Sequence, residues 1–307
     1  MRFSLKNIAI RCFQIITVVI ISIYFINMYK SVSALSISFS SHNIWSILLS
    51  VGLLSTGFFL LPAPTFFLLQ SVGKKISFVG SMKIFFFSEV GKYLPGKVWV
   101  TVGRIMMYSK MGVDRERGIF ILILELSVMI FTAIIYPGRI ILHYITLKPA
   151  ILTIFLSAIP VLLFLIIWKY HISVEKIKKY TIQFTIPAVT IFISFTFFWF
   201  ILGCAFQYLI YYFTQIDIGS FHAMQIFSAS WVVGFLAFFM PVGLGVREAF
   251  MTELLIPVIG NQDALLIAVI ARIWWTFIEA IFIVFSSGKM FSEFLKTNSL
   301  PEPEVIH

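Results

Sequence analysis

The chain has 307 residues, of which 60% are hydrophobic and 12% are charged, and its mean hydropathy is +1.00. Soluble domains of this length are far more polar, so the composition indicates an all-α integral membrane protein that crosses the membrane several times. The net charge of +10 does not indicate a nucleic-acid partner, because no basic stretch lies in a soluble region.

About six full spans are predicted, since an apolar run of ~20 residues is long enough to cross ~30 Å of hydrocarbon. The basic N-terminus leads into the first run without a small-residue cleavage site, which predicts a retained span. Pro62 and Pro64 predict a kink in the second run. The predicted spans are residues 8–28, 44–69, 118–136, 150–168, 186–213 and 264–285.

Two glycine- and proline-rich breaks interrupt this pattern. The first, residues 88–104, reads Ser-Glu-Val-Gly-Lys-Tyr-Leu-Pro-Gly-Lys-Val-Trp-Val-Thr-Val-Gly-Arg. Its proline predicts that a helix entering the break ends near Leu94. The second break, residues 241–249, reads Pro-Val-Gly-Leu-Gly-Val-Arg-Glu-Ala and lies between an apolar run (221–240) and a half-length run (250–259). Irregular backbone at membrane depth is tolerated where protein groups or water in a cavity form hydrogen bonds with its free N–H and C=O groups.

The orientation is predicted from lysine and arginine in the short loops. With the N-terminus in the cytoplasm and the first break returning to its own side, the cytoplasmic segments hold 15 of these residues and the external loops hold 3. A plasma membrane protein of a bacterium with both termini in the cytoplasm is expected. Residues 289–307 form a short cytoplasmic tail in this arrangement.

The same topology makes both breaks re-entrant, one from each side of the membrane. The fifth span ends outside, and the last span must begin outside, so residues 221–260 enter and return. The whole chain, residues 1–307, is then one polytopic transmembrane domain. Its halves, residues 43–136 and 186–285, have the outline of an inverted repeat, in which transporter sites form where broken helices meet.

Several charged residues fall in or beside the apolar runs. Glu125 lies inside the third span, while Arg272 and Glu279 are seven residues apart in the last span and therefore share a helix face. Internal ion pairs that hold the bundle together explain Arg272 and Glu279 about as well as a functional role does. At the breaks, freed amides and basic side chains favour an anion such as phosphate.

The two breaks resemble the paired signatures of the lysylphosphatidylglycerol synthase transmembrane-like family, which includes the flippase domain of the bacterial multiple peptide resistance factor. The resemblance covers nearly the whole chain and implies a membrane protein that moves or handles lipids. The lysyl-transferring members carry a soluble catalytic domain, and this chain ends at His307, so aminoacyl transfer is not expected. The resemblance implies these motif positions: Glu89, Lys92, Tyr93, Pro95, Gly96, Trp99, Arg104, Pro241, Gly243, Gly245, Arg247 and Glu248.

The enzyme classes considered lack parts of their motifs, so no catalytic residue is assigned. Lys97 and Arg104 have the spacing of a lipid phosphatase motif, but Ile105 stands where that motif has proline and its later motifs are absent. Aspartates for a magnesium pyrophosphate site and histidines for a metal site are scattered. Asp114 and Glu116, the nearest acidic pair for a glycosyltransferase, fall on the cytoplasmic side. We expect no metal or cofactor. No nucleotide-binding Gly-x4-Gly-Lys-Ser/Thr motif occurs, so an ion gradient, a lipid gradient or a partner would have to drive any transport.

The leading hypothesis is a lipid flippase or translocase for an anionic phospholipid or a polyprenyl-linked glycolipid in cell-envelope biogenesis. Arg247 and Lys92 would act on the head group, while Glu89 and Glu248 would orient those cations or carry a coupling proton. Lys97, Arg272 and Glu279 complete the candidate substrate-binding set. The alternative is a non-transporting partner or scaffold of a glycosyltransferase in polysaccharide biosynthesis, and a homo-oligomer remains open.

Overall fold

The described part of the protein is an all-helical membrane domain. The computed structural model describes residues 44–93, 98–138, 174–237 and 245–287, and every regular element within these ranges is a helix. Four stretches are long and apolar enough to cross a membrane: Ile44–Ser71, Arg115–Ile135, Ile186–Thr214 and Asn261–Ser286. They confirm four of the predicted spans. The other two, residues 8–28 and 150–168, lie outside the described residues.

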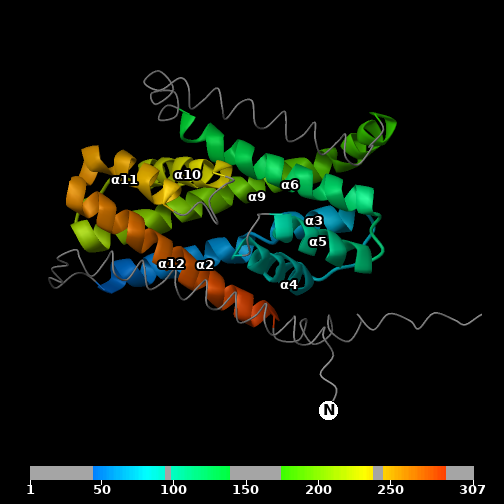
Figure 1. Ribbon diagram of the computed structural model, residues 1–307, viewed down its shortest axis with the longest axis horizontal. Helices are drawn as coiled ribbons and strands as arrows, with labels where there is room; N and C mark the ends of the chain where they lie inside the picture. The colour runs from blue at the N-terminus through cyan, green and yellow to red at the C-terminus, as the bar shows by residue number, and fades with distance from the viewer. Residues whose placement is uncertain (1–43, 94–97, 139–173, 238–244, 288–307) are drawn as a thin grey trace, which may run out of the picture.

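The helices follow the same order in the two halves of the chain. In each half a long membrane-crossing stretch is followed by two shorter helices and then by another long helix (Figure 1). The first half contains α2 (Ile44–Leu60), α3 (Ala63–Ser71), α4 (Phe78–Glu89), the 3-10 turn η1 (Val90–Tyr93), α5 (Val98–Lys110) and α6 (Arg115–Ile135). The second half contains α9 (Val174–Thr214), α10 (Ser220–Leu236), α11 (Val246–Ile259) and α12 (Asn261–Ser287). The predicted inverted repeat of residues 43–136 and 186–285 stays a prediction.

The predicted kink in the second span is confirmed at its two prolines. Pro62 occupies the N-cap of α3 and Pro64 lies in its first turn. Proline fits the first turn of a helix, where its missing N–H would have no partner, but it interrupts a helix that arrives from upstream. The span therefore consists of α2 and α3, joined at residues 61–62.

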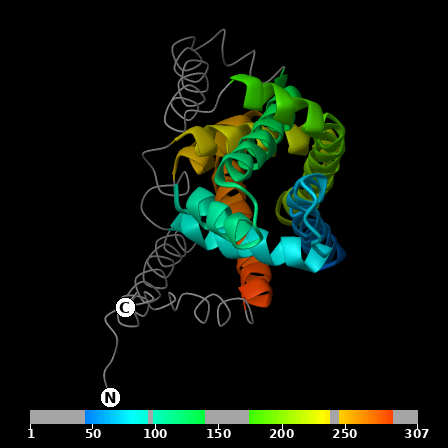
Figure 2. The same ribbon diagram turned by 90° about the vertical axis from the view of Figure 1, so that its right-hand side faces the viewer.

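Helices α4 and α5 form the first hairpin, which lies between α6 and α12 (Figure 2). With 12 and 13 residues, each is only about 18–20 Å long, too short to cross ~30 Å of hydrocarbon. At the tip of the hairpin, a Cβ atom on Gly91 would lie 2.6 Å from the backbone nitrogen of Val100. At its base, Lys74 Nζ lies 3.2 Å from the position of a Cβ on Gly112, so the connectors before α4 and after α5 are neighbours.

Helices α10 and α11 form the second hairpin, which packs against α9 and α12. Gly234 lets the two helices approach closely, because a Cβ there would lie 2.8 Å from Cβ of Arg247. Gly245 has φ of +78° at the N-cap of α11, a conformation that glycine adopts without strain. Its N–H donates to Oε2 of Glu248 at 2.8 Å, which satisfies one amide of the helix N-terminus.

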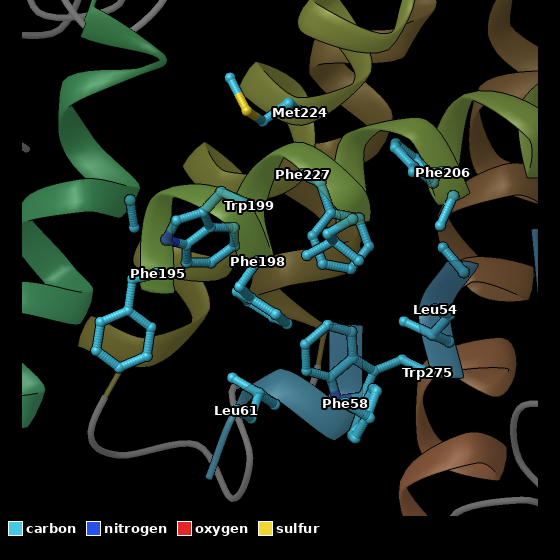
Figure 3. Packing of buried hydrophobic residues seen from close by; sticks show 14 of the residues in the cluster. Leu54, Phe58, Leu61, Phe195, Phe198, Trp199, Phe206, Met224, Phe227 and Trp275 are labelled. Carbon is cyan, nitrogen blue, oxygen red and sulfur yellow. The ribbon is translucent and has the colours of Figure 1, made fainter. Parts of the chain in front are cut away.

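An aromatic core joins α2, α9, α10 and α12 (Figure 3). The ring of Trp275 contacts those of Phe58 and Phe227, with centroid distances of 4.8 and 5.5 Å. Phe198 packs against Trp275 from α9 at 6.3 Å. Aromatic pairs in these geometries contribute ~0.5–1.5 kcal/mol beyond the burial of their area, so this core holds α12 firmly against its neighbours.

The predicted end of the helix in the first break agrees with the structure, whereas the predicted start of the fifth span does not. The helical segment that enters the first break continues from α4 into the 3-10 turn η1, which ends at Tyr93, next to the predicted end near Leu94. Helix α9 begins at Val174, twelve residues before the predicted start at residue 186.

We expect Gly91→Ala to destabilise the first hairpin, because its methyl group would overlap the backbone at the start of α5. Overpacking of this kind costs about 1–3 kcal/mol. The matched control is Gly52→Ala on α2, where a Cβ meets no atom within 4 Å. Thermal unfolding of both variants in detergent tests this, and equal midpoints would show that the hairpin tip can relax.

Candidate functional site

Arg104 is the centre of a first charge cluster, and it is 6% exposed. Its Nη1 donates to Glu125 Oε1 at 2.6 Å, its Nη2 to Glu89 Oε1 at 2.9 Å and its Nε to Ser88 Oγ at 2.9 Å. Glu125 Oε2 also accepts a hydrogen bond from Thr65 Oγ1 at 3.1 Å. The guanidinium thus joins the two arms of the first hairpin to α6, and through Glu125 to α3.

Lys92 extends this cluster from the 3-10 turn to α12. Its Nζ forms an ion pair with Glu279 and lies 3.6 Å from Glu89 Oε2. Glu279 is 3% exposed. A lysine and a glutamate that are both shielded from water stabilise each other's charged forms. The first cluster is therefore composed of Glu89, Lys92, Arg104, Glu125 and Glu279.

The second charge cluster lies where α11 meets α12. Arg272 Nε is 3.6 Å from Glu248 Oε1, which is longer than the ion pairs of Arg104. Arg247 follows Gly245 in the first turn of α11 and is 5% exposed. Its guanidinium carbon lies 4.5 Å from the ring centroid of Phe227 and 5.3 Å from that of Trp275. The second cluster is therefore Arg247, Glu248 and Arg272, supported by two aromatic rings of the core.

Helix α12 joins the two clusters. Arg272 and Glu279 are seven residues apart on α12 and therefore lie on one face of the helix. Arg272 faces the second hairpin and Glu279 faces the first. Seven residues of helix separate them by roughly 10 Å. The two breaks therefore contact the same helix at positions about two turns apart.

The acidic residues of both breaks form ion pairs with arginines inside the bundle. Glu89 pairs with Arg104 and Glu248 pairs with Arg272. A site formed where the two breaks meet would include residues 94–97 and 238–244, which lie outside the described residues, so it stays a prediction. The same holds for Pro95, Gly96, Lys97, Pro241 and Gly243, and for the side chain of Tyr93.

The structure separates Trp99 from the other candidates and adds residues that were not assigned to the site. Trp99 is 49% exposed on α5, unlike the buried members of both clusters. Glu125 belongs to the first cluster, and its signal in the sequence was a carboxylate inside an apolar span. Phe227 and Trp275 carry no such signal, since aromatic residues are common throughout this chain.

Comparison with protein-family models gives a match over residues 14–282 to the lysylphosphatidylglycerol synthase TM region. The chain belongs to this family. The match includes both hairpins and all of α2–α11, together with α12 as far as Phe282. Comparisons with curated proteins and with solved structures found no match. The family is a membrane domain, which agrees with the helices that could cross a membrane.

We expect Arg104→Ala to be strongly destabilising, because it leaves Glu89 and Glu125 without their shared cation. Removing one partner of a buried ion pair costs about 3–5 kcal/mol. The matched control is Arg117→Ala, which removes a half-exposed side chain that lies 3.6 Å from Asp114 at the surface and should cost no more than about 1 kcal/mol.

Thermal unfolding in detergent measures both effects. Adding Glu125→Gln to Arg104→Ala should recover part of the loss, since it removes one of the stranded charges. Similar unfolding midpoints for the Arg104 and Arg117 variants would contradict a structural role for the first cluster.

Proposed function

We propose that this protein binds an anionic lipid and moves it between the leaflets of a bacterial plasma membrane. The lipid class is a phospholipid or a polyprenyl-linked glycolipid used in building the cell envelope. The observation that carries the proposal is the second cluster, where the buried Arg272 lies 3.6 Å from Glu248 and the buried Arg247 lies in the first turn of α11, just after the glycine at its N-cap. No chemical step is part of this function.

The chemistry of the second cluster suits a phosphate group. Guanidinium groups bind phosphate oxygens through two parallel hydrogen bonds, and the positive end of α11 adds to the attraction. Phe227 and Trp275 hold the guanidinium of Arg247 by cation–π contacts, which strengthen when water is excluded. A phosphate would meet side chains already held in place, so little ordering is needed on binding.

A lipid also needs a path for its acyl chains, and an apolar groove between α4 and α12 supports such a path. The groove is lined by Val79, Met82, Lys83, Ile281, Phe282, Phe285 and Ser286. It runs along the same two helices that hold Glu89 and Glu279. The tails of a lipid would lie among the apolar side chains of this groove, while its head group would lie further along α12, at Arg272 of the second cluster.

The proposed orientation places the connectors on either side of the first hairpin in the cytoplasm, so that α4 and α5 enter the membrane and return. In a variant free of Cys12 and Cys204, cysteines at Lys74 and Lys110 should react with an impermeant thiol reagent from the same face. A cysteine at the exposed Ile216, in the loop between α9 and α10, should react from the other face. Labelling of positions 74 and 110 from opposite faces would refute the re-entrant first hairpin.

The functional test compares lipid movement by the wild type and by Arg247→Ala. Loss of a charge-assisted hydrogen bond costs about 1.5–3 kcal/mol, so Arg247→Ala should slow the movement of fluorescent phosphatidylglycerol in proteoliposomes at least tenfold. Arg117→Ala is the control, since its arginine lies at the surface away from both clusters. Both variants must show the wild-type elution profile before they are compared.

The outcomes separate the alternatives. Equal movement by the wild type and Arg247→Ala, above that of empty vesicles, would remove Arg247 from the transport path. If neither the wild type nor a variant moves phosphatidylglycerol or other anionic lipids, the transport proposal fails. The non-transporting partner of a glycosyltransferase then becomes the better explanation of the membrane domain.

A further inference from the structure

A basic hollow lies at the connector between α3 and α4, outside both charge clusters. Its volume is about 670 Å³, and none of its lining residues is acidic. The side chains of Lys74 and Lys75 form no ion pair or hydrogen bond within the described part of the chain. Two cations in a hollow without a carboxylate attract an anion. The lining residues are Gln70, Gly73, Lys74, Lys75, Ile76 and Ser77.

The backbone around the hollow also favours an anion. At the end of α3, the carbonyl oxygens of Leu68, Leu69 and Gln70 already accept hydrogen bonds, so their repulsion of an anion is reduced. Ser77, the N-cap of α4, lines the hollow. The free N–H groups of the first turn of α4 therefore border the hollow, and the positive end of this helix adds to the charge of the lysines.

An apolar groove begins where the hollow ends. The hollow extends to Ser77, and the groove between α4 and α12 begins at Val79 and has a volume of about 450 Å³. Its lining includes Phe285, which is 84% exposed, and one lysine, Lys83. A lysine in such a place can lay its stem along the apolar wall and keep its ammonium group in water. A basic hollow beside an apolar groove matches a lipid, whose charged head group is joined to apolar chains.

The hollow and the charge clusters lie at opposite ends of this groove. The groove lies between the first residues of α4 and the last residues of α12. Lys92, just beyond the other end of α4, pairs with Glu279 of α12. Arg272 lies about two turns further along α12. The hollow, the groove, the first cluster and the second cluster therefore follow one another along these two helices.

We propose that the hollow is a loading site, which binds the phosphate of an anionic phospholipid from the adjacent leaflet while an acyl chain enters the groove. Lys74 and Lys75 pair with the phosphate, and the first turn of α4 donates N–H groups to it. A soluble phosphate would fill the hollow but leave the groove uncovered, so the combined site favours a lipid. This inference takes its lipid class from the proposed function, but binding at the loading site requires neither the second cluster nor transport.

Photo-cross-linking of the full chain in phosphatidylcholine vesicles tests where the lipid binds. A trace of phosphatidylglycerol with a photoreactive acyl chain is added, and the cross-linked peptides are identified by mass spectrometry. We expect cross-links within residues 79–83 and 281–286. Unlabelled phosphatidylglycerol should compete for these sites, whereas additional phosphatidylcholine, which has no net charge, and glycerol phosphate, which has no acyl chain, should not.

The variant Lys74→Gln with Lys75→Gln should lower the cross-linking yield. Two lysines near an anionic head group change its affinity by about thirtyfold, so the yield at low lipid concentration should fall by a similar factor. The matched control is Lys110→Gln with Arg115→Gln, which removes two exposed cations near the connector between α5 and α6. These residues do not line the hollow, so the control should keep the wild-type yield.

A second variant tests the groove without changing any charge. Val79 is 59% exposed, so Val79→Trp is tolerated at the surface and places a larger side chain in the groove. We expect this variant to lower the cross-linking yield within residues 281–286. An unchanged yield there would refute the groove as the place of the acyl chain. All variants must show the wild-type elution profile before they are compared.

The remaining outcomes separate the loading site from the proposed function. Equal yields in the two double variants would refute the loading site, since general attraction to basic connectors would then explain the binding. Strong competition by glycerol phosphate would overturn the assignment to a lipid. Loss of cross-linking in Arg247→Ala, but not in the Lys74 and Lys75 variant, would refute the loading site and leave the proposed function standing. Lysine-dependent cross-linking without lipid movement by the wild type would support the loading site and overturn the proposed function.

Discussion

The arrangement of this protein depends on the requirement that charges at membrane depth find partners. A lone charge at the centre of a span costs about 2.5–3.5 kcal/mol even on the insertion scale, and Arg272 and Glu279 lie well inside the span formed by α12. Arg272 pairs with Glu248 of the second hairpin, and Glu279 pairs with Lys92 at the tip of the first. Their spacing therefore fixes where η1 and the start of α11 can lie.

The two clusters satisfy this requirement in different ways, which suggests different roles. Arg104 uses three of its nitrogens in hydrogen bonds to Glu125, Glu89 and Ser88, so little of its donor capacity is left for a ligand. Arg272 meets its carboxylate at 3.6 Å through Nε, and the guanidinium of Arg247 lies against aromatic rings. The first cluster is built like a structural joint, whereas the geometry of the second supports the proposed binding of an anion.

The sequence predicts most of the helices but not the side-chain contacts between them. Long apolar runs and prolines predicted the spans and the kink, because burial in hydrocarbon imposes length and composition on each span separately. The breaks were visible from glycine, proline and charge. The partner of Glu279 was not, since the contact of Lys92 with α12 joins residues 187 positions apart. Pairings of this kind depend on packing, and a single sequence carries no record of them.

The geometry of the first break shows the same limit at shorter range. Proline rules predict where a helix can no longer continue, and the helical segment ends at Tyr93, close to the predicted Leu94. These rules do not predict that the segment changes from α to 3-10 geometry at Val90. Lys92 lies on this 3-10 turn, from which it reaches Glu279 on α12. The turn thus connects the first break to the helix that also holds the second.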